Sequence, residues 1–331
     1  MPIPNTDVEQ RLSRHRTARR ISRLGTLTAI LALGLSAAAT AATPTAPGVS
    51  TGAAKQVSYS SAVLTGAVNP KASNTSYYFQ YGITKGYGGQ SAIADAGAGS
   101  SSVKVAVPLA GLQPITLYHY RLVAVNASGP TLGSDHTFVT TKVPLSLAIL
   151  ASPNPVVFGG PVVIQGTLSG TDNGGRQVVL QADQFPFTAG FLNVGNPELT
   201  TATGGFTFTL LDATLTSQFR VVTTTNPAVV SPVVAEGVNV SVSSHVRKGH
   251  RHGFLVFYGT VTPAENGAQI AILRITHGHG VLAAGTTLRA NNAGSSKFSR
   301  EIRSRRGVYR IGARIIGAGQ GSAYGQPIVI R

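Results

Sequence analysis

The stretch Leu112–Pro130, LQPITLYHYRLVAVNASGP, carries the clearest fold signal of this chain. Tyr118, Tyr120, Leu122 and Ala124 alternate with other residues, which is typical of a strand that buries one face. A Leu-x-Pro-x-Thr turn comes just before the first tyrosine. This spacing predicts a tyrosine corner, in which the ring of Tyr118 enters the core and its hydroxyl bonds the backbone just upstream.

Short segments of the same kind surround this stretch on both sides. They are rich in β-forming residues, are separated by Gly, Pro, Asn and Ser turns, and cover residues 60–70, 76–82, 102–112 and 134–141. Several short strands at such spacing, with turn signals between them, predict a β-sandwich.

These segments resemble a fibronectin type III domain of a kind common in exported proteins of high-GC Gram-positive bacteria. The matching residues are AVLTGAVNP, YYFQYGITKGYG, LAGLQPITLYHYRLVAVNASG and GSDHTFVTT. Many members carry a tryptophan on the second strand, whereas this chain has no tryptophan and has small residues around Leu64 and Gly66 there. The resemblance implies a sandwich over residues 56–143 and an extracellular setting.

An internal repeat fills the rest of the chain. VVIQGTLSG, GGRQVVLQ, GGFTFTL and SQFRVVTT recur in order as LVFYGTVTP, NGAQIAIL, SSKFSREI and GVYRIGAR. Gly166 precedes Phe206 by 40 residues, and Gly259 precedes Phe298 by 39. We therefore expect two more sandwiches, at 144–237 and 238–331, which resemble bacterial immunoglobulin-like modules. The fold class is all-β, with three tandem sandwiches after an N-terminal signal helix.

The N-terminal segment has the pattern of a secretory signal. Six arginines precede an uncharged apolar run over residues 24–40, and Ala39 and Ala41 form an A-x-A site. This predicts a signal peptide over 1–41, then a linker over 42–55 without regular structure, and export to the cell surface or beyond. The alternative is an uncleaved signal anchor, and only in that case would the protein contact the membrane.

Charge and cysteine content limit the classes of function. The chain has no cysteine, which excludes disulfides and thiolate chemistry. Its net charge is +16, and residues 238–331 hold thirteen basic and two acidic side chains. A basic module on an otherwise mildly charged protein points to polyanionic partners.

The arginines of the last module are concentrated between Phe298 and Arg314. Guanidinium groups bind phosphate and carboxylate well, and two strands joined as a hairpin would place the arginines in one patch. The expected partner is an anionic envelope polymer or polysaccharide, or a surface protein. Specific nucleic-acid readout is not expected, because the chain has no recognisable nucleic-acid-binding motif. The predicted anion-binding residues are Arg300, Arg303, Arg305, Arg306, Arg310 and Arg314.

Two H-x-H pairs raise a second possibility. His250 with His252, and His277 with His279, would each project from one face of a strand and offer imidazoles to zinc, copper or nickel. Glycines flank both pairs, which favours solvated loops instead. A metal site is therefore the alternative interpretation of these four residues.

Three short motifs resemble catalytic or cofactor signatures without their structural context. Gly48–Gly52 matches G-x-S-x-G, but a nucleophile elbow needs a strand before it and a helix after it. Ser134, Asp135 and His136 are adjacent, so Asp135 would point to the strand face opposite to Ser134 and His136. The glycines of residues 317–321 precede no helical pattern.

We therefore expect no cofactor and a non-catalytic binding, adhesion or spacer protein. The alternatives are accessory binding modules of an extracellular hydrolase system and a histidine-based metal-binding protein.

Overall fold

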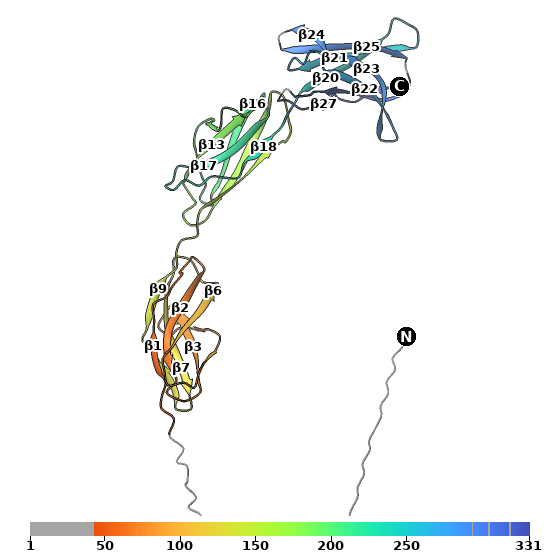
Figure 1. Ribbon diagram of the computed structural model, residues 1–331. Helices are drawn as coiled ribbons and strands as arrows, with labels where there is room; N and C mark the ends of the chain where they lie inside the picture. The colour runs from red at the N-terminus through yellow and green to blue at the C-terminus, as the bar shows by residue number, and fades with distance from the viewer. Residues whose placement is uncertain (1–42, 293, 304, 318) are drawn as a thin grey trace, which may run out of the picture. The chain divides into compact units, whose positions relative to one another are not determined.

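The computed structural model describes residues 43–292, 294–303, 305–317 and 319–331, and the predicted signal lies outside them. Every regular element in this part is a β-strand, as the alternating sequence predicted (Figure 1). The described chain contains no helix with the length and apolarity that a membrane crossing requires. The fold is all-β and consists of three two-sheet sandwiches.

The first sandwich is formed by two sheets of antiparallel strands. One sheet has the order β1-β2-β6, and the other has β4-β3-β7-β8 with β5 and β9 also paired to β3 and β7. The bounds are β1 Gly48–Thr51, β2 Ser61–Asn69, β3 Thr75–Gly82, β4 Gly89–Gln90, β5 Ala94–Gly97, β6 Val103–Ala110, β7 Leu117–Asn126, β8 Gly129–Leu132 and β9 His136–Val139.

The tyrosine corner is present as predicted. The Tyr118 hydroxyl accepts a hydrogen bond from the backbone N–H of Gln113 at 3.0 Å, and the Tyr118 ring stacks on Phe138. Tyr120 and Leu122 are fully buried further along β7. The period-two pattern of the sequence therefore encodes the core of this sandwich.

The expectation that residues 42–55 lack regular structure is wrong at Gly48–Thr51. This segment forms β1, which pairs antiparallel with β2. Thr51 Oγ1 accepts a hydrogen bond from the Leu122 N–H, and the Tyr120 hydroxyl donates to the Gly52 carbonyl at 2.7 Å. The segment has the composition of a linker, so no strand was expected there. Contacts with β7, which is distant in the sequence, fix the strand in place. The G-x-S-x-G match therefore lies on and just after an edge strand and not on a strand-to-helix turn.

The second sandwich follows the same plan. Its sheets have the orders β10-β12-β16 and β14-β13-β17-β18, β15 also pairs with β13, and β11 pairs with β19 in parallel. The bounds are β10 Ser146–Ser152, β11 Val156–Val157, β12 Gly160–Ser169, β13 Gln177–Gln184, β14 Leu192–Asn193, β15 Glu198–Leu199, β16 Gly205–Ala213, β17 Ser217–Thr223, β18 Val234–Glu236 and β19 Val238–Asn239.

The third sandwich has the same two-sheet plan as the second. Its sheets have the orders β20-β21-β25-β24 and β23-β22-β26-β27, and β28 also pairs with β26. The bounds are β20 Ser241–Lys248, β21 Phe254–Thr262, β22 Gln269–Thr276, β23 His279–Thr287, β24 Arg289–Asn292, β25 Ser295–Arg303, β26 Gly307–Arg314, β27 Ala323–Tyr324 and β28 Ile328–Ile330. The four repeated sequence segments correspond to β12, β13, β16 and β17 and to β21, β22, β25 and β26.

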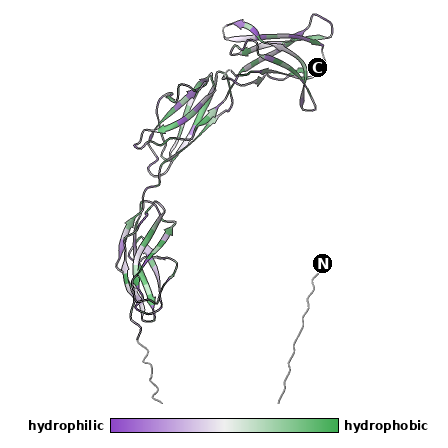
Figure 2. Cartoon of the chain, viewed as in Figure 1, coloured by the Kyte–Doolittle hydropathy of each residue, from purple (hydrophilic) through white to green (hydrophobic). Residues whose placement is uncertain are grey.

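Each sandwich has its own apolar cluster between its two sheets. Figure 2 shows hydrophobic and hydrophilic residues mixed along the strands, as strands with one buried face require. In the two repeats a glycine lies opposite a phenylalanine, Gly166 with Phe206 and Gly259 with Phe298. The missing side chain makes room for the aromatic ring in both cases. The similar spacing in the sequence, 40 and 39 residues, therefore reflects the same glycine–phenylalanine packing in both repeats.

Candidate anion-binding surface on the third sandwich

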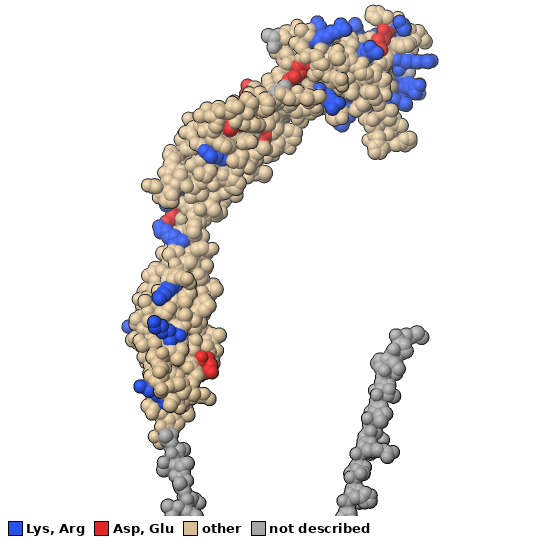
Figure 3. Space-filling model, in the orientation of Figure 1, with Lys and Arg blue, Asp and Glu red and all other residues tan. Residues whose placement is uncertain are grey.

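The six predicted arginines lie on β25, on the connection after it, and on β26. All of them are exposed to solvent. Figure 3 shows Lys and Arg gathered on the third sandwich and sparse on the other two in this view. The arginines thus belong to a broad cationic surface.

The arrangement of these arginines differs from the expected hairpin. β25 and β26 are not hydrogen-bonded to each other, because β25 pairs with β21 and β24 whereas β26 pairs with β22. Arg303 lies opposite Phe254 in one sheet, and Arg310 lies opposite Leu273 in the other. The expectation of one patch across a hairpin is therefore wrong: the chain crosses between the sheets after Arg303.

The outer face of β20, β21 and β25 adds basic and aromatic residues that the sequence reasoning missed. His245 lies opposite Tyr258, with ring centroids 5.5 Å apart, and the Arg247 guanidinium lies 5.7 Å from the centre of the same ring. Lys297 and Arg289 are cross-strand partners, and both are exposed. Strand parity was the signal that could have found Arg247 and Lys297, since both occupy outward positions.

The two carboxylates of this sandwich do not neutralise its arginines. Glu301 Oε1 accepts hydrogen bonds from the backbone N–H groups of His250 and Arg251 at 2.8 and 3.3 Å. Burial raises the pKa of Glu265, which favours its neutral form. Among the described residues of this sandwich, no Lys or Arg forms an ion pair with a carboxylate. The positive charge is therefore available to an external anion.

The two H-x-H pairs lie in or beside turns. His250 and His252 are in the turn between β20 and β21, and His277 is in the turn between β22 and β23, with His279 at the start of β23. Within the described ranges, no three His, Asp or Glu side chains come close enough together to hold a metal ion. The structure thus does not assemble the four imidazoles into one site. His250, His252 and His277 lie in turns, as the flanking glycines favoured, and the strand placement that the metal-site alternative required is absent for these three.

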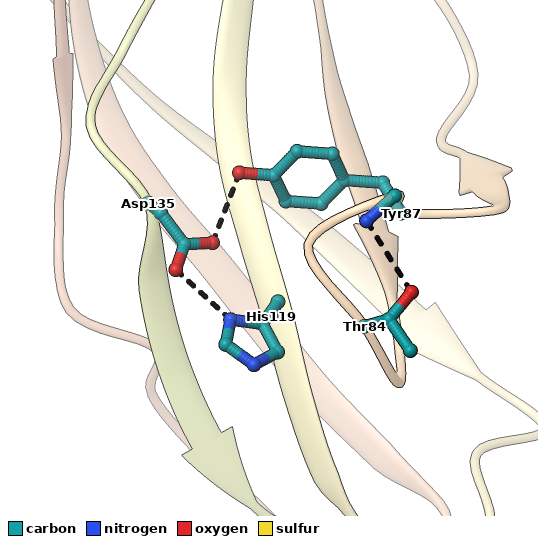
Figure 4. A network of polar contacts seen from close by, with 5 residues as sticks. Thr84, Tyr87, His119 and Asp135 are labelled. Carbon is teal, nitrogen blue, oxygen red and sulfur yellow. Dashed lines mark hydrogen bonds and ion pairs between the residues drawn. The ribbon is translucent and has the colours of Figure 1, made fainter.

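The Ser134-Asp135-His136 run does not form a catalytic arrangement. Asp135 Oδ2 lies 2.9 Å from His119 Nδ1, and Asp135 Oδ1 accepts a 2.9 Å hydrogen bond from the Tyr87 hydroxyl (Figure 4). The Tyr87 ring also faces the Arg121 guanidinium at 4.6 Å. Burial raises the pKa of Asp135, but the hydrogen bonds from His119 and Tyr87 outweigh it, so the net shift is downward. This cluster connects the turn after β3 with β7 and the segment before β9.

Comparisons with known proteins assign no family. No protein-family model matches the chain, and no curated protein matches it either. Solved structures that match include the chicken CNTN1 FN1-FN3 domains, at 13% identity over 87% of this chain and 98% of that one, with a TM-score of 0.27. A tetra-tandem repeat from the extending region of a large adhesion protein matches at 16% identity over 85% and 73%, with a TM-score of 0.29. These values are too low to define a family, so the sheet topology and cores described above define the fold.

Proposed function

We propose that this protein is an exported, non-catalytic binding and spacer protein whose third sandwich contacts an anionic polymer of the cell envelope or matrix. The single observation that carries the proposal is the unpaired positive charge of that sandwich. Thirteen basic side chains meet only two acidic ones there, and among the described residues neither acid forms an ion pair with a Lys or Arg.

The first two sandwiches fit a spacer role. Residues 44–143 and 144–237 carry net charges of only +4 and −3. The polar cluster around Asp135 in the first sandwich is satisfied internally by His119 and Tyr87. Because long-range attraction to a polyanion grows with local charge, contact through the third sandwich is favoured over contact through the others.

Export and surface localisation belong to the same proposal. They are supported by the basic n-region, the apolar run and the A-x-A site of the N-terminal sequence. The domain boundaries 56–143, 144–237 and 238–331 are proposed with it, with the first domain extended to include β1 and the second extended through β19, because Val238 belongs to the core of the second sandwich. A partner protein on the cell surface and a role as accessory modules of a hydrolase system remain the alternatives.

Co-sedimentation with isolated Gram-positive cell wall across a salt series tests the proposal. Attraction between exposed charges is screened as the Debye length falls from about 10 Å at 0.1 M salt to about 3 Å at 1 M. We expect the purified protein to sediment with the wall at low salt and to be released as salt increases. Absence of binding at low salt, or binding that moderate salt leaves unchanged, would contradict the electrostatic contact.

A further inference from the structure

A cavity of about 340 Å³ opens in the third sandwich between the β22–β23 hairpin and the β25–β26 connection. Its lining includes Arg274 of β22, Leu282 and Ala283 of β23, Arg303, and Arg305. Three arginines therefore line one hollow that also has apolar lining residues. Two of them belong to the predicted cluster, and Arg274 does not.

Arg274 occupies a position that the strand pattern assigns to the interior. Ile270 and Ile272 precede it on the same face of β22 and are buried, and Tyr309 lies opposite it. Arg274 Nη2 donates to the Arg306 carbonyl at 2.9 Å, but the Nε atom is buried without a hydrogen-bond partner. A buried N–H of a cation without an acceptor is unfavourable, and a bound anion would supply the acceptor.

Gly307 lies beside this guanidinium and places no side chain against it. Its φ of 141° lies in the region that favours glycine, and a Cβ there would stand 3.1 Å from Arg274 Nε and 3.7 Å from Nη2. A side chain at this position would therefore intrude on the two nitrogens that form one edge of the guanidinium fork. That edge is one of the two edges of a guanidinium that can bind a planar oxyanion in a bidentate manner, and its Nη2 also donates to the Arg306 carbonyl.

A β-bulge shapes the opposite wall. Ile272 pairs with Ala284 and Leu273 pairs with Leu282, so Ala283 is the extra residue of β23. Bulges redirect side chains and are frequent beside functional sites. Here Leu282 and Ala283, which are adjacent in the sequence, both line the cavity, and Leu282 is 64% exposed.

We propose that this cavity binds one carboxylate-bearing sugar unit of the anionic polymer. Arg274 takes the carboxylate, Arg303 and Arg305 add charge at the rim, and Leu282 and Ala283 contact the C–H face of the sugar ring. This inference rests on the proposed function, since it names the subsite at which the polymer is recognised. A planar guanidinium matches a carboxylate better than a point charge does.

Isothermal titration of the purified full chain with a galacturonic-acid oligosaccharide tests this site. Arg274→Gln removes the guanidinium, and Ala283→Phe fills the cavity from an exposed strand position without changing the charge. Arg331→Gln is the matched control, because it removes one exposed arginine of the same sandwich outside the cavity. We expect affinity to fall at least about tenfold in the first two variants and to stay within about twofold in the control. In ¹⁵N spectra, the Nε–H resonance of Arg274 should shift on titration of the wild type.

Wild-type affinity retained in both Arg274→Gln and Ala283→Phe would overturn the site. Equal or tighter binding of a glycerol-phosphate oligomer would overturn the assignment to a carboxylate sugar. If Arg274→Gln does not fold, Ala283→Phe alone decides. Cell-wall sedimentation of the same proteins separates the two proposals. If the wild type and the variants all sediment with the wall and the variants keep wild-type affinity for the sugar, only the cavity assignment fails. If the wild type itself does not sediment with the wall, the proposed function fails.

Discussion

Gly259 lies directly opposite Phe298 in the antiparallel pair of β21 and β25, and the Phe298 ring fills the space that a side chain at Gly259 would need. A Cβ on Gly259 would stand 2.8 Å from Phe298 Cζ and would also overlap the carbonyl oxygen of Ser243. Gly166 and Phe206 show the same relationship in the second sandwich. The core of each repeat is therefore built on a glycine that an aromatic ring covers.

Gly259→Ala is expected to destabilise the third sandwich by about 2 kcal/mol, because overpacking a well-filled core typically costs 1–3 kcal/mol. Chemical denaturation measures the change. Gly285→Ala is the matched control, since a Cβ there has no neighbour closer than 3.7 Å. Equal stability of the two variants would show that the Phe298 ring can pack against an alanine at position 259 without cost.

Tyr118→Phe tests the tyrosine corner. The variant keeps the ring stacked on Phe138 but removes the acceptor for the Gln113 N–H. Loss of one such hydrogen bond is expected to lower the free energy of unfolding of the first sandwich by about 1 kcal/mol. Tyr59→Phe, at an exposed position, serves as the control and should leave that free energy within about 0.5 kcal/mol of the wild type.

Glu236 gives the second sandwich an unusual pH dependence. Its side chain is buried, Oε1 accepts from the Val156 N–H at 3.1 Å, and Oε2 has no partner. Burial raises the pKa of Glu236, so the folded state holds this proton more tightly than the unfolded state does. Stability should therefore be highest below the unfolded pKa and should decrease as pH rises through the folded one.

Glu236→Gln should remove this decrease and stabilise the second sandwich by about 1 kcal/mol at neutral pH, because an ionised buried group is replaced by a neutral one. Thermal melts at a series of pH values measure the effect. Glu198→Gln, at an exposed position of β15, should leave the pH profile as it is. A Glu236→Gln variant that is less stable at neutral pH would mean that the charge is better solvated than its burial implies.

Asp135 gives the first sandwich a pH dependence of stability opposite to that which Glu236 gives the second. Its pKa is lowered overall by His119 and Tyr87 against the effect of burial, so its contribution is present above the unfolded pKa and is lost as pH falls through the folded pKa. Asp135→Asn is expected to cost about 1 kcal/mol at neutral pH and to reduce the acid sensitivity of the first sandwich. Urea denaturation at neutral and acidic pH measures both effects, and an unchanged acid limb would refute the assignment. The exposed Asp212→Asn is the control.

Much of the fold could be predicted because its signals are local. The alternation of Tyr120 and Leu122 and the corner at Tyr118 each depend on a few neighbouring residues. The Gly-to-Phe spacing is longer, at 40 and 39 residues, but it could be recognised because it occurs twice in the sequence. β1 was missed because its residues have a linker's composition, and contacts with Leu122 and Tyr120, which are distant in the sequence, fix it in place.

The site was less predictable than the fold. Alternation shows which residues share a face, but it does not show whether two successive strands pair or lie in different sheets. The arginines of β25 and β26 were therefore assigned to one hairpin although they belong to two sheets. Arg274 was not predicted as a site residue. Alternation with Ile270 and Ile272 places it on the inward face of its strand, and a charged residue at an inward position is a signal that could have identified it.

In the proposed function the third sandwich, and not the protein's overall charge, makes the contact with an anionic polymer. Two variants that each lose four positive charges separate these possibilities. One changes Arg300, Arg303, Arg310 and Arg314 to Gln, and the other changes the exposed Lys55, Lys71, Lys85 and Lys104 of the first sandwich to Gln. Co-sedimentation with isolated cell wall at low salt measures both against the wild type. We expect the arginine variant to stay in the supernatant and the lysine variant to sediment as the wild type does. Equal loss of binding in the two variants would show that overall charge, and not the third sandwich, makes the contact.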